Sequence, residues 1–326
     1  MELEGRIKTY LQAKLPQAEG PEIGRVERMS GGNSRETLAI DARWREKGAD
    51  VARSFVFRRE LTGSVLETTS DHEYNVIRCL MPSAVPVPEV YWLETDGKWL
   101  DRPFFVMEKV VGDPPARLAG DPEERTRILH AFIKSMGDLH NADWGKLGLS
   151  FLGVPRNAEE CAGMPIAKWR DIYDRTAIEP EPIVVELLQW LDRNKPKKVE
   201  RVSVIHGDPG PGNFISKDGK VLAIHDWEMS HLGDPMDDVG WICWRGGMFG
   251  SGKEEILRLY EHYSAIKVNQ ESVFYWEVFA NVKAATACLT GGAAFCTGAN
   301  RMLNMAQVGL GGSRRFLQRA AEMVGF

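Results

Sequence analysis

The sequence predicts an α+β fold in which a β-rich amino-terminal part precedes a mainly helical carboxy-terminal part. Up to residue 108, short apolar and β-branched runs alternate with turn residues, which is the pattern of strands. Beyond that point, apolar residues recur at helical spacing over long segments. A Gly/Pro cluster at 112–115 lies where the pattern changes and is typical of a linker. We therefore expect a first domain at 1–108 and a second at 109–326.

The first part begins with a predicted helix and continues with strands. Ile7, Leu11 and Leu15 recur at i, i+4 and i+8, which predicts a helix over 5–15. A Gly-rich break at 30–34 lies between two strand-like segments and indicates a hairpin. The expected strands are 25–29, 36–41, 54–59, 90–94 and 104–109, with a helix at 71–80.

The second part is expected to be helical around one short strand-rich segment at 201–228. The predicted helices are 121–141, 180–194, 252–266, 270–291 and 313–324. Glycine clusters at 290–292 and 309–312 predict breaks between the last helices. Trp241 and Trp244 stand at i and i+3, which favours packing in a helical core over a place in a substrate wall.

Composition excludes several classes of protein. The 326 residues carry 41 Lys and Arg against 46 Asp and Glu, a net charge of −5, and 43% of them are hydrophobic. Such a chain folds, lacks the apolar run of a membrane span, and lacks the basic surface of a nucleic-acid binder. Its charged beginning does not resemble a signal peptide, and its five cysteines are scattered without a CxxC pair. We expect a cytoplasmic protein with reduced thiols and with neither a membrane nor a nucleic acid as partner.

The strand-rich segment carries the chemistry. Apolar runs end at Asp208, in H-G-D-P-G-P-G-N, and at Asp226, in D-W-E, so each carboxylate is expected at the end of a strand. Between them, a Gly/Pro-rich turn directs Asn213 back toward the same place. Two carboxylates and an amide oxygen are hard ligands that suit Mg²⁺. A pair of β-turns capped by Asp and Asn explains any one of these residues but not the whole set.

These motifs resemble those of kinases. The Asp-to-Asn spacing equals that of the protein-kinase catalytic loop H-R-D-x4-N, and D-W-E takes the place of D-F-G. With G-D-P at 233–235, the chain resembles the aminoglycoside phosphotransferase and choline-kinase-like family, above all the kinase-like domain attached to some acyl-CoA dehydrogenases. The resemblance implies a bilobal, protein-kinase-like fold and transfer of the γ-phosphoryl of ATP to a hydroxyl of a small molecule.

The resemblance also implies roles in the second domain. Asp208 is similar to the catalytic aspartate that orients the acceptor hydroxyl, and Asn213 and Asp226 are similar to the Mg²⁺ ligands. His206 is expected to brace the loop, while Glu228 and Asp238 hold its geometry. For Asp234, the sequence leaves a helix cap and a place behind the metal site equally open.

In the first domain, the resemblance implies the ATP site. Strand 54–59 is expected to supply the phosphate-binding cation, and its alternation places Arg58 rather than Arg59 on the face of Val56. Glu73 resembles the helix glutamate that pairs with this cation. The other implied nucleotide contacts are the hairpin residues Ser30, Gly31, Gly32, Asn33 and Ser34 and the hinge residues Met107, Glu108 and Val110.

The sequence says least about the acceptor. Acidic residues between 159 and 192 and arginines between 301 and 319 both fit solvated helix faces. We favour a hydroxyacyl-CoA or a comparable metabolite over an aminoglycoside or other antibiotic, and the choice between ATP and GTP and the oligomeric state stay open.

Two other function classes compete with a kinase. One is a catalytically idle kinase-like module that binds a nucleotide or a partner, although all three key positions are filled. The other is a metallohydrolase that uses His206, Asp208, His225, Asp226 and His231. Against the latter, neighbouring residues on a strand, such as His225 and Asp226, point to opposite sides.

Overall fold

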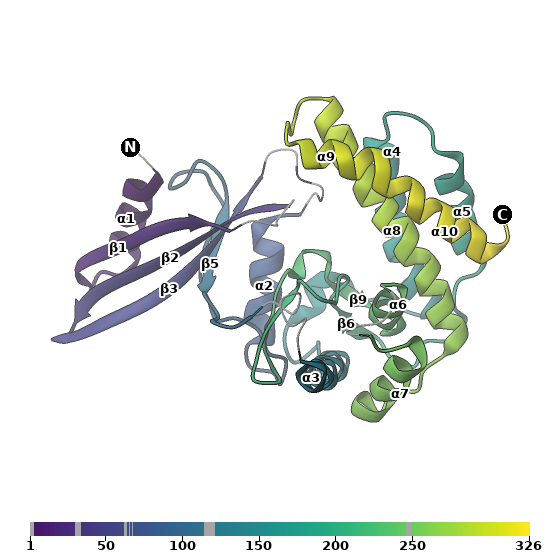
Figure 1. Cartoon of the computed structure of the whole chain (residues 1–326), viewed down its shortest axis with the longest axis horizontal. Helices are drawn as coiled ribbons and strands as arrows, with labels where there is room; N and C mark the ends of the chain where they lie inside the picture. Colours follow the sequence, from purple (N-terminus) through teal and green to yellow (C-terminus); the bar gives the residue numbers. More distant parts are fainter. Residues whose placement is uncertain are drawn as a thin grey trace. The chain divides into compact units, whose positions relative to one another are not determined.

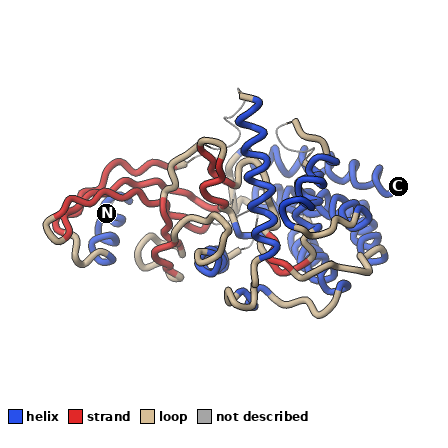
Figure 2. The backbone as a smooth tube through the Cα atoms, turned by 90° about the horizontal axis from the view of Figure 1, so that it is seen from below, coloured by secondary structure: helices blue, strands red, loops and turns tan. Residues whose placement is uncertain are grey.

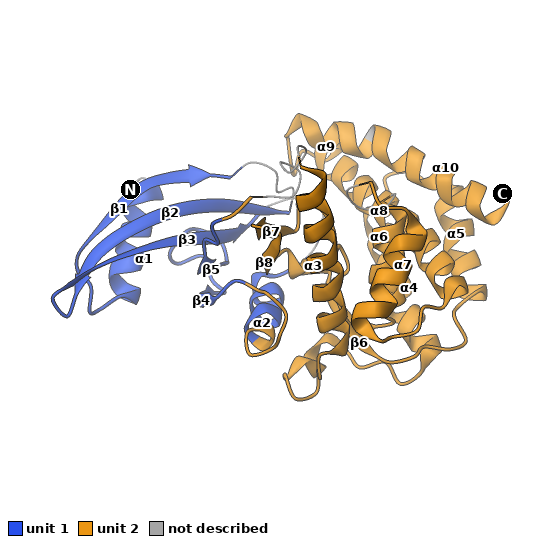
Figure 3. Cartoon of the chain, turned by 60° about the horizontal axis from the view of Figure 1, so that its bottom comes forward, with its two compact units in different colours: residues 1–78, 88–111 blue, residues 79–87, 112–326 orange. Residues whose placement is uncertain are grey.

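The protein is described by a computed structural model that covers residues 3–29, 34–61, 64, 66, 68–113, 121–245 and 250–326. The chain forms two compact units, coloured in Figure 3: unit 1 comprises Met1–Arg78 and Pro88–Val111, and unit 2 comprises Cys79–Val87 and Gly112–Phe326. Strands gather in unit 1 and helices in unit 2 (Figure 2), which confirms the expected α+β class. The expected division into domains at 1–108 and 109–326 stays a prediction.

Unit 1 is built on a five-stranded antiparallel sheet (Figure 1). Its strands lie in the order β1-β2-β3-β5-β4. The elements of unit 1 are α1 (Leu3–Lys14), β1 (Glu19–Arg28), β2 (Arg35–Glu46), β3 (Ala49–Glu60), α2 (Ser70–Leu80), β4 (Val90–Glu94) and β5 (Phe104–Glu108). All the helices and strands expected there are present, and β1, β2 and β3 are longer than predicted.

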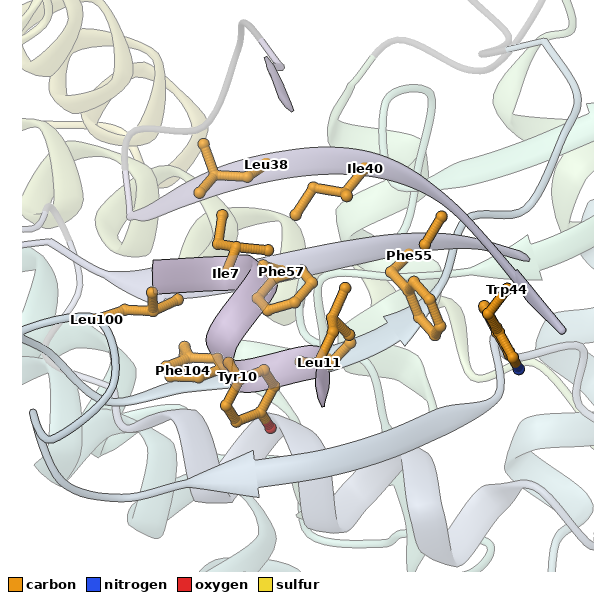
Figure 4. Packing of buried hydrophobic residues seen from close by; sticks show 12 residues of the cluster. Ile7, Tyr10, Leu11, Leu38, Ile40, Trp44, Phe55, Phe57, Leu100 and Phe104 are labelled. Atoms are coloured by element: carbon orange, nitrogen blue, oxygen red, sulfur yellow. The ribbon is translucent and has the colours of Figure 1, made fainter. Parts of the chain in front are cut away.

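The two faces of this sheet serve different purposes. On one face, Ile7, Tyr10 and Leu11 of α1 join the buried core made by Phe55 and Phe57 of β3 and their neighbours (Figure 4). On the other face, Tyr74 of α2 packs edge-on against Phe105 of β5, with ring centroids 6.2 Å apart. Because strand residues alternate between faces, Arg58 lies on the α2 side, away from the aromatic core.

Unit 2 consists of helices around two small antiparallel sheets, one of β6 and β9 and one of β7 and β8. Its helices are α3 (Pro122–Asn141), α4 (Ala158–Thr176), α5 (Pro182–Arg193), α6 (Met236–Trp244), α7 (Lys253–Ser264), α8 (Gln270–Cys296), α9 (Leu303–Gln307) and α10 (Ser313–Val324). Its strands are β6 (Ser203–Ile205), β7 (Phe214–Lys217), β8 (Lys220–Ile224) and β9 (His231–Gly233). Backbone hydrogen bonds in both directions join Asp113 to Ser216, so the chain enters unit 2 along β7.

The central helix α8 corrects one prediction, because it runs through the expected break at 290–292 and ends at Cys296. The reason is packing. A Cβ added to Gly309 would lie 2.3 Å from Cα of Gly292, so the two glycines let two helical segments cross at close range. The second cluster does mark a change, since Val308–Gly312 forms a π-helical turn between α9 and α10. In the described ranges, no helix is long and apolar enough to cross a membrane.

Candidate active site

The loop after β6 and the hairpin of β7 and β8 bring two of the three key residues into contact. Nδ2 of Asn213 donates to the Oδ2 atom and to the carbonyl oxygen of Asp208, in both cases at 2.8 Å. The backbone N–H of His225 donates to the carbonyl of Asn213 at 2.9 Å, which places the residue before Asp226 beside the turn. The convergence expected from the motif spacing is therefore present for Asp208 and Asn213, and the chain reaches Asp226 next to them.

Asp226 has an unusual backbone. It lies just beyond β8 with φ 71° and ψ 53°, a left-handed conformation that costs most residues energy and that aspartate tolerates better than others. The next residue, Trp227, is fully buried, and its indole N–H donates to the carbonyl of Ile224 at 3.0 Å. This anchor holds the turn that presents Asp226.

His206 braces the loop as expected. Its Nε2 donates to the carbonyl of His225 at 3.0 Å, and its Nδ1 accepts from the backbone N–H of Asp208 at 3.2 Å. Both bonds together require the neutral ring with the proton on Nε2. The ring also packs on Trp227, with centroids 4.6 Å apart. His206 is thus held by the scaffold on both nitrogens.

Asp238 of α6 is the main anchor of the loop, which confirms its expected role. Its two carboxylate oxygens accept from the backbone N–H groups of His206 and Gly207, each at 2.8 Å, and Nε2 of His140 lies 3.0 Å from Oδ2. Burial disfavours its ionised form, but the hydrogen bonds and charge of His140, with further contributions from His206, outweigh burial and lower the pKa of Asp238. Tyr260 completes the chain with a hydroxyl 2.7 Å from Nδ1 of His140.

Lys283 of α8 holds the same loop from the other side, and the sequence did not predict it. Its buried amine donates to the carbonyl of Gly207 at 2.7 Å and lies 3.5 Å from the carboxylate of Asp237. It also lies 4.1 Å from the centroid of the Trp241 ring. Gly207 is needed here, because its φ is 87° and a Cβ would lie 2.6 Å from the carbonyl oxygen of Met229.

The open question about Asp234 is resolved in favour of a structural role. Its Oδ1 accepts from the backbone N–H of Met236 at the start of α6, and its Oδ2 accepts from Ser272 and from the indole of Trp276 on α8. Burial raises the pKa of this carboxyl group. Trp241 and Trp244 are buried, with ring centroids 4.7 Å apart, so the expected packing role is confirmed as well.

A second cation that the sequence did not reveal contacts the key aspartate directly. Nη2 of Arg245, the residue after α6, donates to Oδ1 of Asp208 at 2.6 Å. The side chains are 33% and 23% exposed, so this pair lies at the surface of unit 2. Arg245 follows a tryptophan-rich helix and belongs to no motif, and only the three-dimensional structure assigns it to the site.

In unit 1, the predicted facing of the strand is confirmed. Nε of Arg58 lies 3.2 Å from Oε2 of Glu73 on α2, and both side chains are buried. Arg59 points to the opposite face, where its guanidinium donates to Glu36 and to the carbonyl of Leu100. The ion pair between strand cation and helix glutamate is therefore formed by Arg58 and not by Arg59.

The remaining nucleotide-site predictions fall on two segments. Met107 is buried, Glu108 is exposed and Val110 is half-buried. The backbone N–H of Glu108 already donates to the carbonyl oxygen of Glu89 at 2.8 Å. Ser34 is buried at the start of the second hairpin strand. Ser30, Gly31, Gly32 and Asn33 lie outside the described residues.

The geometry weighs against a metallohydrolase. Among the residues whose placement is described, no three His, Cys, Asp or Glu side chains converge as a metal site would require. His206 is committed to backbone groups, and Nε2 of His231 lies 3.3 Å from the carboxylate of Asp237 instead. A Mg²⁺ ion makes smaller demands, since one or two protein oxygens together with phosphate and water can bind it.

Comparison with known proteins gives the same picture. Residues 27–277 match the phosphotransferase enzyme family. Over 248 residues, the chain is 30% identical to acyl-CoA dehydrogenase family member 11 of Gallus gallus; the match covers 73% of this chain but only 30% of that protein. The chain thus spans less than a third of the length of this curated relative.

Two solved structures share the fold. One is a provisionally named aminoglycoside phosphotransferase from Ralstonia eutropha, with a TM-score of 0.73 and 23% identity over 98% of this chain and 97% of that one. The other is a thermostable variant of aminoglycoside phosphotransferase APH(4)-Ia in complex with ADP and hygromycin B, with a TM-score of 0.62 and 16% identity over the same shares. The expected bilobal, protein-kinase-like fold is confirmed, and the match over residues 27–277 shows that this chain belongs to the phosphotransferase enzyme family.

Proposed function

We propose that this protein is an ATP- and Mg²⁺-dependent kinase that phosphorylates a hydroxyl of a small molecule. The observation that carries the proposal is the contact between Asp208 and Asn213, in a loop whose backbone is fixed by Asp238 and Lys283. A carboxylate at the tip of a rigid loop can orient a hydroxyl group for attack. An idle module has no use for such a carboxylate.

In the proposed reaction, a bond forms between the acceptor oxygen and the γ-phosphorus of ATP. The bond from that phosphorus to the oxygen bridging to the β-phosphate breaks, and ADP leaves. Asp208 accepts a hydrogen bond from the acceptor hydroxyl and takes its proton late in the transfer. Asn213 fixes one oxygen of this carboxylate through its Nδ2. The side chain of Asp208 therefore starts the reaction already oriented.

The residues at this site fit Mg²⁺. Both side-chain hydrogen bonds of Asn213 in the described structure use its Nδ2, so its side-chain oxygen is the atom suited to a hard cation. Asp226 would add a carboxylate, from a backbone conformation that is strained in the way functional residues often are. Bound Mg²⁺ neutralises the charge on the phosphates during transfer.

We further propose that unit 1 supplies the nucleotide contacts. Arg58 is always charged and can donate two N–H groups to phosphate oxygens, and the buried Glu73 holds it in place. The backbone at Glu108 and Val110 would receive the adenine edge, with Met107 behind it. Since the N–H of Glu108 is used by Glu89, the contact there would fall to its carbonyl oxygen. The Gly-rich segment 30–34 would cover the phosphates.

For the acceptor, we place a hydroxyacyl-CoA or a comparable metabolite ahead of an aminoglycoside. The support is the similarity to acyl-CoA dehydrogenase family member 11, at 30% identity, against 23% to the Ralstonia eutropha protein and 16% to the aminoglycoside phosphotransferase solved with hygromycin B. The cytoplasm, where ATP and such metabolites occur, is the proposed compartment.

The test measures Mg²⁺-dependent ADP release over a panel of 4-hydroxyacyl-CoAs, choline, homoserine, sugars, aminoglycosides and macrolides. We expect one acceptor class to raise the rate, and Asp208→Ala to abolish this rise while ATP still binds. Asp226→Ala should weaken binding of Mg·ATP itself. Asp192→Ala, which removes a surface carboxylate of the same unit paired with Arg170, is the control and should change neither.

Three outcomes would contradict parts of the proposal. Turnover that survives Asp208→Ala removes that residue from its role. Unchanged Mg·ATP affinity in Asp226→Ala removes the metal assignment. ATP binding without turnover on any acceptor supports the idle module instead.

A further inference from the structure

The carboxylate of Asp208 already has a donor on each oxygen. Asn213 donates to Oδ2 at 2.8 Å, and Arg245 donates to Oδ1 at 2.6 Å. The first bond serves the proposed kinase, because it orients the carboxylate. The second places a positive charge on the oxygen that an acceptor hydroxyl, or a water molecule in its stead, would otherwise use. Arg245 therefore competes directly with the nucleophile.

The guanidinium of Arg245 lies between the Trp241 ring and the backbone of Gly210. It is 5.4 Å from the centroid of the Trp241 ring, and an added Cβ on Gly210 would lie 3.3 Å from its Cδ. In the described residues, Asp208 is the one hydrogen-bond partner of this side chain. A guanidinium has five N–H donors in a planar fork, which suits a ligand with two acceptor oxygens.

The ion pair is also easy to exchange. Both side chains are partly exposed, and such a pair stabilises a protein far less than a buried one. Opening it without replacement leaves a cation without its counter-charge. An incoming oxyanion removes that cost, because carboxylate and phosphate groups accept two parallel N–H bonds from arginine.

The charges next to this ring are balanced rather than of one sign. Lys283 also lies against the Trp241 ring, but it is paired with the carboxylate of Asp237 at 3.5 Å. The attraction for an anionic group therefore comes from Arg245 itself.

We propose that Arg245 seals Asp208 until the acceptor binds, and that the alcohol accepted here carries an oxyanion that takes over the guanidinium. The inference rests on the proposed kinase function and deepens it. Sealing limits wasteful transfer of the γ-phosphoryl to water, which would give ADP and inorganic phosphate. Exchange of partners frees Oδ1 for the acceptor hydroxyl only when a matching anionic group arrives.

The first arm of the test needs no acceptor. ADP release from Mg·ATP is measured for the wild type, Arg245→Met, Arg245→Gln and Arg245→Lys. We expect the two neutral variants to raise the rate by roughly tenfold, part of the 10²- to 10⁴-fold that a positioned base contributes. Arg245→Lys keeps the charge and should stay near the wild type. Arg170→Met, which removes a surface arginine paired with Asp192, is the matched control and should leave the rate unchanged.

The second arm compares 4-hydroxybutanoate with 4-hydroxybutanamide, which differ in the anionic group alone. The carboxylate should raise ADP release by the wild type more than the amide does, and the difference should vanish in Arg245→Met. ADP release by both neutral variants at or below the wild-type rate, with ATP affinity unchanged, would overturn the inference, as would equal effects of the two compounds on the wild type. Failure of the wild type to bind Mg·ATP would refute the proposed function itself, and the inference with it.

Discussion

Replacement of Asp238 should be the most damaging single change near the catalytic loop. This carboxylate is fully buried and accepts from two backbone N–H groups and from His140. Asp238→Ala leaves two buried donors without a partner, at about 1–3 kcal/mol each, and removes the partner of a buried histidine. We expect a loss of about 3–5 kcal/mol in the free energy of unfolding of unit 2.

The measurement is urea unfolding followed by tryptophan fluorescence, with the slope compared between variants. Asp192→Ala is the control, because it removes a carboxylate from an exposed pair and should cost about 0.2–1 kcal/mol. An Asp238→Ala loss no larger than that of the control would refute the view that this residue holds the loop.

The pH dependence gives an independent check. The folded-state pKa of Asp238 is lowered, so its ionised form contributes stability above the unfolded-state pKa, near 4, and the contribution is lost as pH falls through the folded-state value. Asp238→Asn keeps the shape but cannot ionise, and its amide N–H₂ would face a backbone N–H. The difference in unfolding free energy between the wild type and Asp238→Asn should therefore shrink as the pH falls below the unfolded-state pKa of about 4. A constant difference would contradict the stated cause.

Three further predictions use residues away from the loop. Arg58→Ala should raise the KM for ATP much more than Arg59→Ala, and steady-state kinetics decide; the reverse order would contradict the strand facing. Both variants lose an ion pair and should melt at a lower temperature, so thermal stability alone does not separate them. Gly309→Ala should lower the free energy of unfolding in urea by about 1–3 kcal/mol, because the new Cβ overlaps α8 at Gly292. Gly311→Ala, which has open space around it, should be near neutral. Equal effects would refute the close crossing of the two helical segments at Gly292 and Gly309. Iodoacetamide at pH 8 should label the exposed Cys296 well before the buried thiols, and mass spectrometry identifies the sites. Burial raises the pKa values of these thiols to about 12, 12 and 11, for Cys161, Cys243 and Cys288.

The parts of the site that the sequence predicted are those governed by local rules. The period of two in a strand placed Arg58 and Arg59 on opposite faces, and the resemblance to kinases chose the face of Val56 and Arg58. Motif spacing was enough to join Asp208 to Asn213. Both depend on residues a few positions apart or on one regular element. Such relations survive folding largely unchanged.

The parts that the sequence did not predict depend on neighbours that are distant along the chain. Lys283 stands within an apolar helix, and only the crossing of α8 beneath the loop explains a buried amine there. The glycines at 290–292 were expected to break a helix, because an isolated helix is weakened by glycine. Gly292 instead makes room for Gly309, and close packing outweighs the intrinsic preference. A sequence without aligned relatives carries no signal for either contact.

The loop that carries Asp208 is held at one residue, Gly207, from two directions. The N–H of Gly207 donates to Asp238 of α6, while the carbonyl of the same residue accepts from Lys283 of α8. With φ at 87° and no room for a side chain, this position requires glycine, so its backbone depends on the two contacts to stay in place. Asp208 directly follows Gly207. Its carboxylate is partly exposed and is hydrogen-bonded by the side chains of Asn213 and Arg245. The scaffold thus fixes the backbone of the loop and leaves the carboxylate as the group that a ligand can engage, which explains why a partly exposed arginine, rather than a core residue, controls access to it.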